Sequence, residues 1–86
     1  MVFLALTRAG YDELTAKLDE VPSPIWVNAG VLSASEVSQL RADGVDLSCF
    51  TNPIDHSQPS ALVNAVATIS EHHPGQAIWV EQLREL

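Results

Sequence analysis

The sequence has little cysteine, little positive charge and no long apolar run. Its single cysteine, Cys49, cannot form an internal disulfide, which fits a reducing compartment. Only four lysine and arginine residues stand against eleven acids, for a net charge of −7. Because binding to nucleic acid or to an anionic membrane depends on many basic contacts, we expect neither as a partner.

The N-terminal residues lack the features of a targeting segment. MVFLALT carries no basic region and only a short apolar run, which is typical of a strand rather than of a signal peptide. No stretch approaches the roughly 20 apolar residues that span a bilayer. We therefore expect a cytoplasmic protein. Its length of 86 residues predicts a single α/β domain, residues 1–86, with a thin core.

Four short apolar runs alternate with three stretches of helical periodicity. The runs are residues 2–6, 25–27, 45–50 and 77–80. Between them, apolar residues recur every three or four positions, as on the buried face of a helix. This βαβαβαβ order predicts a three-layer αβα fold with a four-stranded parallel sheet. Residues 81–86 are expected to form either a last helical turn or a tail.

The clearest local signal lies before the second helix. Ser33 and Glu36 have the spacing of a capping box, in which each side chain satisfies the other residue's free backbone N–H. Leu32 and Val37 have the spacing of a hydrophobic staple around the same cap. Gly44 suits the left-handed position that follows the end of a helix.

The most common way to join four such strands predicts the order 2-1-3-4. The first and third strands would then be central, with the first helix on one face and the other two helices on the opposite face. One helix cannot cover four strands, so part of its face should stay exposed near an edge strand and its tryptophan. Exposed apolar patches mark association sites, which predicts a homodimer.

A ligand site is expected where the strand order reverses, beyond the carboxyl ends of strands one and three. Thr7, Arg8 and Gly10 follow the first of these strands, and Asn52 and His56 follow the other. Free N–H groups at the start of the first helix favour an anion. The alternative is that Thr7 only caps the helix and Gly10 only allows close packing. Neither a Walker pattern nor a dinucleotide fingerprint is present.

His56 and Cys49 are the weak catalytic candidates. Asp55, His56 and Ser57 are consecutive, and consecutive side chains diverge, so they do not predict a triad. His56 alone could exchange a proton near neutral pH. Cys49 is expected to be buried by packing, and it would serve as a nucleophile only if it were exposed beside a positive group such as Arg8.

No metal or cofactor is expected. The adjacent residues His72 and His73 would point about 100° apart on a helix, a poor geometry for holding one ion. A histidine near a helix C-terminus is favourable without a metal.

Together these features predict a binding module that self-associates rather than an enzyme. The alternative is an enzyme or sensor that binds a small anionic, phosphorylated ligand at the carboxyl ends of strands one and three.

Overall fold

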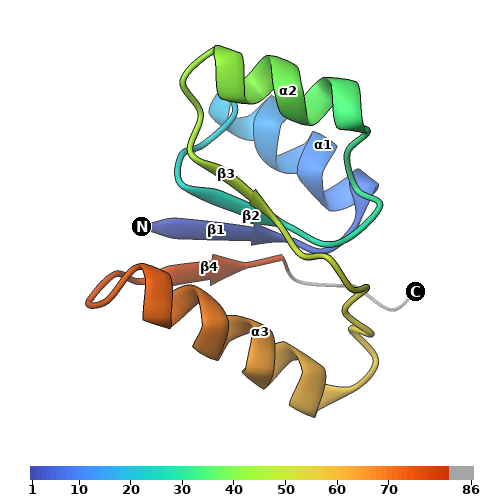
Figure 1. Ribbon diagram of the computed structural model, residues 1–86, viewed down its shortest axis with the longest axis vertical. Coiled ribbons are helices and arrows are strands. Elements are labelled where there is room, and N and C mark those ends of the chain that lie inside the picture. Colours follow the sequence, from blue (N-terminus) through green and yellow to red (C-terminus); the bar gives the residue numbers. More distant parts are fainter. Residues whose placement is uncertain (82–86) are drawn as a thin grey trace.

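The computed structural model describes residues 1–81, and residues 82–86 are outside its described part. Four strands and three helices alternate (Figure 1): β1 (Val2–Ala5), α1 (Arg8–Leu18), β2 (Ile25–Val27), α2 (Ala34–Ala42), β3 (Leu47–Cys49), α3 (Pro59–His72) and β4 (Ile78–Val80). The predicted alternation is confirmed. The turn or tail expected at residues 81–86 falls, apart from Glu81, outside the described residues. Within residues 1–81, no helix has the length and apolar character needed to cross a membrane.

All four strands are parallel and lie in the order β3-β2-β1-β4. The parallel α/β sheet is as predicted, but the order 2-1-3-4 is wrong. β2 is central and β3 lies at an edge. In the observed register, Phe3 of β1 aligns with Ile25 of β2 on one side and with Trp79 of β4 on the other.

Side-chain burial explains this order. All three residues of β2 are buried, whereas only Leu47 is buried in β3. A strand that is apolar on both faces is most stable in the centre of a sheet, and a strand with polar or exposed residues is most stable at its edge. The short length of β2 and its neighbouring prolines point to an edge, but they are weaker signals than burial on both faces.

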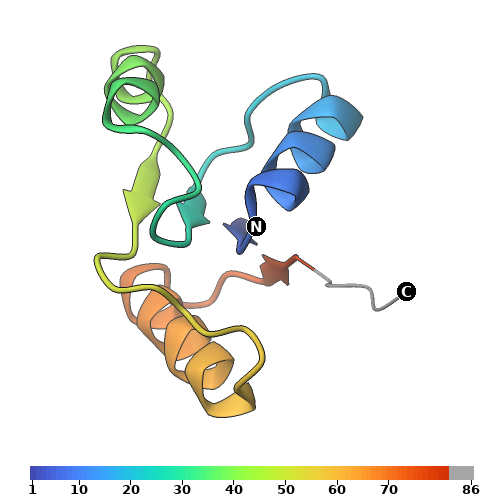
Figure 2. The same cartoon turned by 90° about the vertical axis from the view of Figure 1, so that its right-hand side faces the viewer.

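The three helices are divided between the two faces of the sheet. α1 and α2 lie on one face, and α3 lies on the other (Figures 1 and 2). The expectation that α2 shares a face with α3 is wrong. The chain steps in one direction from β1 through β2 to β3, and right-handed crossovers then place both connecting helices on one face. The return from β3 to β4 runs the opposite way and places α3 on the other face.

The sheet separates two apolar clusters. The cluster beneath α1 and α2 is built on these buried residues: Ala5, Tyr11, Leu14, Ile25, Val27, Val31 and Leu47. The cluster beneath α3 is built on Val2, Leu4, Leu6, Trp26, Ala65 and Ile69. β1 supplies both clusters because its side chains alternate between the two faces.

The ends of α2 follow the local sequence signals. The Ser33 hydroxyl accepts from the Glu36 N–H at 3.2 Å, and the Glu36 carboxylate accepts from the Ser33 N–H at 3.0 Å, so the capping box is confirmed. At the other end, Gly44 has a φ of 91°, as its predicted position requires. The Val45 N–H donates to the Leu40 carbonyl at 3.0 Å and closes the helix.

Candidate functional site

The point where the strand order reverses lies between β1 and β4. The expected position between strands one and three is wrong, because β2 separates those strands. Residues 7–10 still lie at this point, since they follow β1. Their neighbour is the carboxyl end of β4, so Glu81 lies beside them in the sheet, where the sequence predicts Asn52 and His56.

Glu81 is buried, with 8% of its surface exposed, and its carboxylate binds the start of α1. One oxygen accepts from the Leu6 N–H at 2.8 Å and from the Thr7 N–H at 2.9 Å. The other accepts from the Thr7 hydroxyl at 2.6 Å. A carboxylate at this position is favourable because the free N–H groups and the helix dipole both attract negative charge.

Thr7 binds this carboxylate, and Gly10 leaves the space that it occupies. The Thr7 hydroxyl caps α1 by accepting from the Gly10 N–H at 3.0 Å. A Cβ atom on Gly10 would overlap the Glu81 carboxyl group, so only glycine leaves room for it. The start of α1 therefore holds an anion, but this anion is the chain's own Glu81 carboxylate rather than the external ligand that the sequence predicts. Binding of an external anion stays a prediction, and such a ligand would have to displace Glu81.

Arg8 links α1 to α2. Its guanidinium forms an ion pair of 2.7 Å with Glu36 and one of 3.1 Å with Asp12, and it lies 5.5 Å from the centre of the Tyr11 ring. The pKa of Glu36 lies below its usual value, first because the Ser33 N–H donates to the carboxylate and second because Arg8 donates to it. The pKa of Arg8 is raised, chiefly by its hydrogen bond to Glu36. Burial raises the pKa of Tyr11.

His56 is exposed on the loop between β3 and α3. Asp55 accepts from the backbone N–H and the hydroxyl of Ser57, chiefly the hydroxyl, and this lowers the pKa of Asp55. Asp55 therefore stabilises a local turn before α3, and its hydrogen bonds are to Ser57 rather than to His56.

Cys49 is exposed at the end of the edge strand β3. The expectation that packing buries it is wrong because β3 lies at an edge. Arg8, the positive group expected to activate an exposed Cys49, is paired with Glu36 and Asp12.

Asn28 is a buried residue that holds the loop after β3 in place. Its amide nitrogen donates to the carbonyls of Leu6 and Ile54, at 3.2 and 3.1 Å. Its oxygen accepts from the N–H groups of Ala29 and Ile54, at 2.8 and 2.7 Å. Every hydrogen-bonding capacity of the amide is used inside the fold, so Asn28 is a structural residue.

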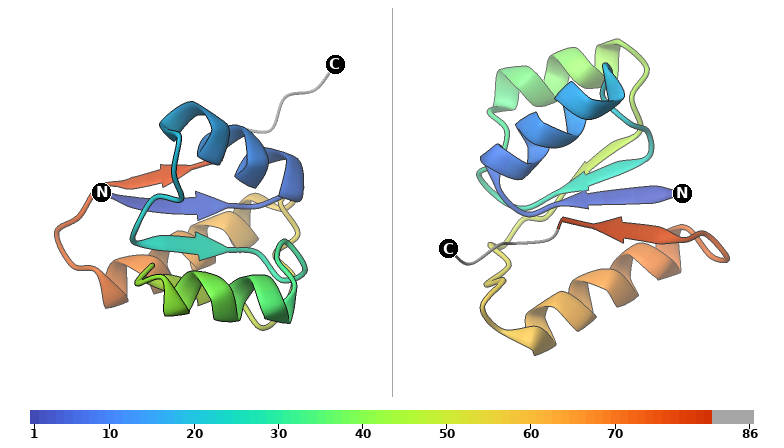
Figure 3. Two further views of the ribbon diagram at one scale, coloured as in Figure 1. Left: turned by 90° about the horizontal axis from the view of Figure 1, so that it is seen from above. Right: turned by 180° about the vertical axis from the view of Figure 1, so that it is seen from behind.

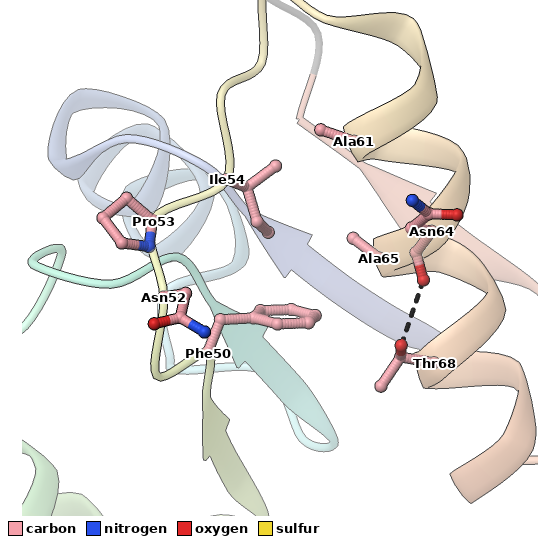
Figure 4. Close-up of a pocket in the computed structure, with 8 residues that line it drawn as sticks. All are labelled: Phe50, Asn52, Pro53, Ile54, Ala61, Asn64, Ala65 and Thr68. Atoms are coloured by element: carbon pink, nitrogen blue, oxygen red, sulfur yellow. Dashed lines mark hydrogen bonds between the residues drawn. The ribbon is translucent and has the colours of Figure 1, made fainter.

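A pocket of about 410 Å³ lies between this loop and α3 (Figure 4). It is lined by eight residues: Phe50, Asn52, Pro53, Ile54, Ala61, Asn64, Ala65 and Thr68. Of the predicted ligand-binding residues, the pocket contains Asn52 alone. The remainder comes mostly from α3, where Ala61 and Ala65, one turn apart, leave space beside the loop. This small-residue spacing is the only sequence signal for the pocket.

His73 is a partner of Trp26 in the cluster beneath α3. The Trp26 Nε1–H donates to His73 Nε2 at 3.2 Å, and the His72 ring packs edge-on against the same indole at 5.2 Å between ring centres. Among residues 1–81, no group of three histidine, cysteine or acidic side chains could hold a metal ion. The two histidines therefore contribute to packing.

The exposed aromatic surface lies on β4. Trp79 is 37% exposed and packs against Phe3, with 6.0 Å between the ring centres. Phe3 packs against the cluster beneath α1 and α2. Trp79 is aligned with Phe3 in the neighbouring strand, so its side chain lies on the same face of the sheet. The sequence predicts an open patch on this face because α1 would cover it alone, and that reason is wrong, since α2 shares the face with α1. Trp79 of the edge strand β4 is nevertheless exposed, whereas Trp26 is buried.

No protein-family model, no curated protein and no solved structure matches the chain. Among the described residues, the features that bear on function are the Glu81 contact, the pocket and the edge of β4.

Proposed function

We propose that this protein is an interaction module that self-associates through the free edge of β4. The observation that carries the proposal is the direction of the backbone groups of that strand. The Ala77 carbonyl accepts from Val2 at 2.8 Å, and the Glu81 N–H donates to Leu4 at 3.0 Å, so both point to β1. Backbone groups alternate along a strand, so the N–H and C=O groups of Ile78 and Val80 point away from β1.

In the part of the chain that the structure describes, no strand lies beyond β4 (Figure 3). An edge of this kind is a template for pairing with another strand. Two copies related by a two-fold axis would pair their β4 strands antiparallel. With Trp79 opposite its own copy, each Ile78 would exchange two hydrogen bonds with Val80 of the other copy, and the two sheets would form one.

This register suits the side chains as well as the backbone. Trp79 would form a pair without direct hydrogen bonds, in which opposite Cα atoms approach to about 4.5 Å and side chains are closest. The two indoles would bury each other on the face where each already contacts Phe3.

The other edge of the sheet is protected. The outward carbonyl of Leu47 in β3 accepts two hydrogen bonds from the Arg41 guanidinium, at 3.2 and 3.0 Å. A basic side chain over an edge strand blocks the approach of another chain. β4 has no such side chain among the described contacts, and this difference between the two edges favours β4 as the interface.

Sedimentation equilibrium of the purified protein, between about 1 and 500 μM, tests the proposal. The short strands make a small interface, so we expect a monomer–dimer equilibrium with a dissociation constant of about 10–100 μM. Trp79→Thr keeps a good strand former and should weaken the dimer at least about tenfold.

Val63→Thr is the matched control, because Val63 is an apolar residue of α3 that is 67% exposed. It should leave association unchanged. A protein that stays monomeric at 500 μM, or a Trp79→Thr variant that dimerises as tightly as the wild type, would overturn the proposal.

A further inference from the structure

We infer that the pocket between α3 and the loop after β3 binds an uncharged, flat heterocycle, with an adenine nucleoside as the best-matched class. This inference does not depend on self-association, because the pocket lies on the α3 face and the exposed Trp79 lies on the other. Its volume of about 410 Å³ is within the range of small-ligand sites.

The walls of the pocket suit a flat apolar body. The Phe50 ring extends from the loop toward α3, and Ile54 lies on the same side (Figure 4). Ala61 and Ala65 form the opposite wall, where their small side chains leave the space open. A ring that enters between them would stack against Phe50, and aromatic stacking tolerates any flat ring.

Polar groups around these walls restrict the ligand further. Asn52 comes from the loop, and Asn64 and Thr68 come from α3. The Thr68 hydroxyl donates to the Asn64 carbonyl at 3.0 Å and keeps its lone pairs available to accept. Asn side chains offer a donor and an acceptor side by side, the pattern that matches the N6 and N7 edge of adenine.

The electrostatics of the pocket favour a neutral ligand. None of the eight described lining residues is charged or titratable, and the chain carries a net charge of −7. A phosphate would enter a negative field without a basic partner, and an isolated cation would have no carboxylate in the lining. A ligand that hydrogen-bonds without charge avoids both penalties.

The pocket is also preformed. Asn28 bonds both backbone groups of Ile54, and the indole of Trp26 packs against the Phe50 ring at 5.2 Å between ring centres. The loop wall is therefore held before a ligand arrives, which lowers the entropic cost of binding.

NMR titration of the full chain with adenosine tests the inference, with AMP and toluene as comparison probes. Adenosine should shift the side-chain amides of Asn52 and Asn64 and the backbone amide of Thr68, with a dissociation constant of about 0.1–1 mM. AMP should bind more weakly than adenosine because of its charge. Toluene should bind more weakly because it makes no hydrogen bond.

Ala61→Leu fills the pocket from the helix surface and should weaken adenosine binding at least about tenfold, the effect of losing about 1.4 kcal/mol. Ala67→Leu is its matched control, since Ala67 is exposed on the same helix and does not line the pocket. Asn64→Leu should also weaken adenosine binding, and it should leave toluene binding unchanged.

Four results would overturn the inference. They are no shift of these amides with about 2 mM adenosine, tighter binding of AMP than of adenosine, equal effects of the two alanine substitutions, or adenosine binding that is insensitive to Asn64→Leu.

Discussion

Replacing Gly10 by alanine is expected to destabilise this protein, although the same change stabilises most helices. Gly10 has no positive φ and lies in the first turn of α1, where alanine normally adds about 1 kcal/mol. Here the new Cβ would overlap the Glu81 carboxyl group and force it from the start of the helix. The sign of the effect therefore depends on what the Glu81 contact contributes.

The magnitude follows from the groups that lose their partner. Displacing Glu81 leaves the Leu6 and Thr7 N–H groups without an acceptor, and the first of these is buried. An unsatisfied buried group costs about 1–3 kcal/mol, and the Thr7 N–H and hydroxyl are only part-buried and therefore cost less than the Leu6 N–H, so we expect the three groups together to lose about 3–5 kcal/mol. After subtraction of the helix gain of about 1 kcal/mol, the free energy of unfolding should fall by about 2–4 kcal/mol.

Urea denaturation of Gly10→Ala at pH 7 and about 1 μM protein measures this change below the concentration at which dimers form. The control is a double-mutant cycle with Glu81→Ala. In that background the clash is gone, so Gly10→Ala should stabilise by about 0.5–1 kcal/mol. A Gly10→Ala variant that is more stable than the wild type, or a cycle without coupling energy, would refute the reasoning.

Three further predictions concern the loop, the α1–α2 link and the protected edge. Asn28→Ala should lower the free energy of unfolding, measured by urea denaturation, by about 2–4 kcal/mol. The substitution removes buried hydrogen bonds of the Asn28 side chain, among them the two that it makes to the backbone of Ile54. The pKa of Glu36 is lower in the folded state than its usual value of 4.5, so the ionised carboxylate stabilises the fold at pH values above 4.5. This contribution is lost as the pH falls through the folded pKa. Glu36→Gln should therefore destabilise the protein at pH 7 and have little effect at pH 2. Arg41→Ala uncovers the Leu47 carbonyl at the edge of β3 and should promote higher oligomers, as light scattering would detect.

Features that depend on neighbouring residues could be predicted from the sequence. The capping box of Ser33 and Glu36 involves residues three apart, and the turn at Gly44 follows from one residue's conformational freedom. The alternation of strands and helices also follows from local periodicity. These features need no knowledge of how distant segments pack.

The strand order and the Glu81 contact could not be predicted in this way. The order depends on which strand gains most from burial on both faces. Two polar residues of the third strand indicate that it belongs at an edge: Ser48 within β3 and Asp46 directly before it. Glu81 lies 74 positions from Thr7, and their contact depends on β4 pairing with β1. Residues 7–10 lie at the reversal point in both strand orders because they follow β1, whereas the loop that carries Asn52 and His56 follows the edge strand β3 and does not.

Hydrogen exchange at the β4 amides, measured against protein concentration, tests self-association most directly. The Ile78 and Val80 amides point outward in the monomer, whereas the Trp79 amide points to β1 and is the internal control. Self-association through β4 predicts that Ile78 and Val80 become protected as the concentration rises from about 1 to 500 μM, while protection of Trp79 hardly changes. Exchange at Ile78 and Val80 that is fast and independent of concentration would contradict the account.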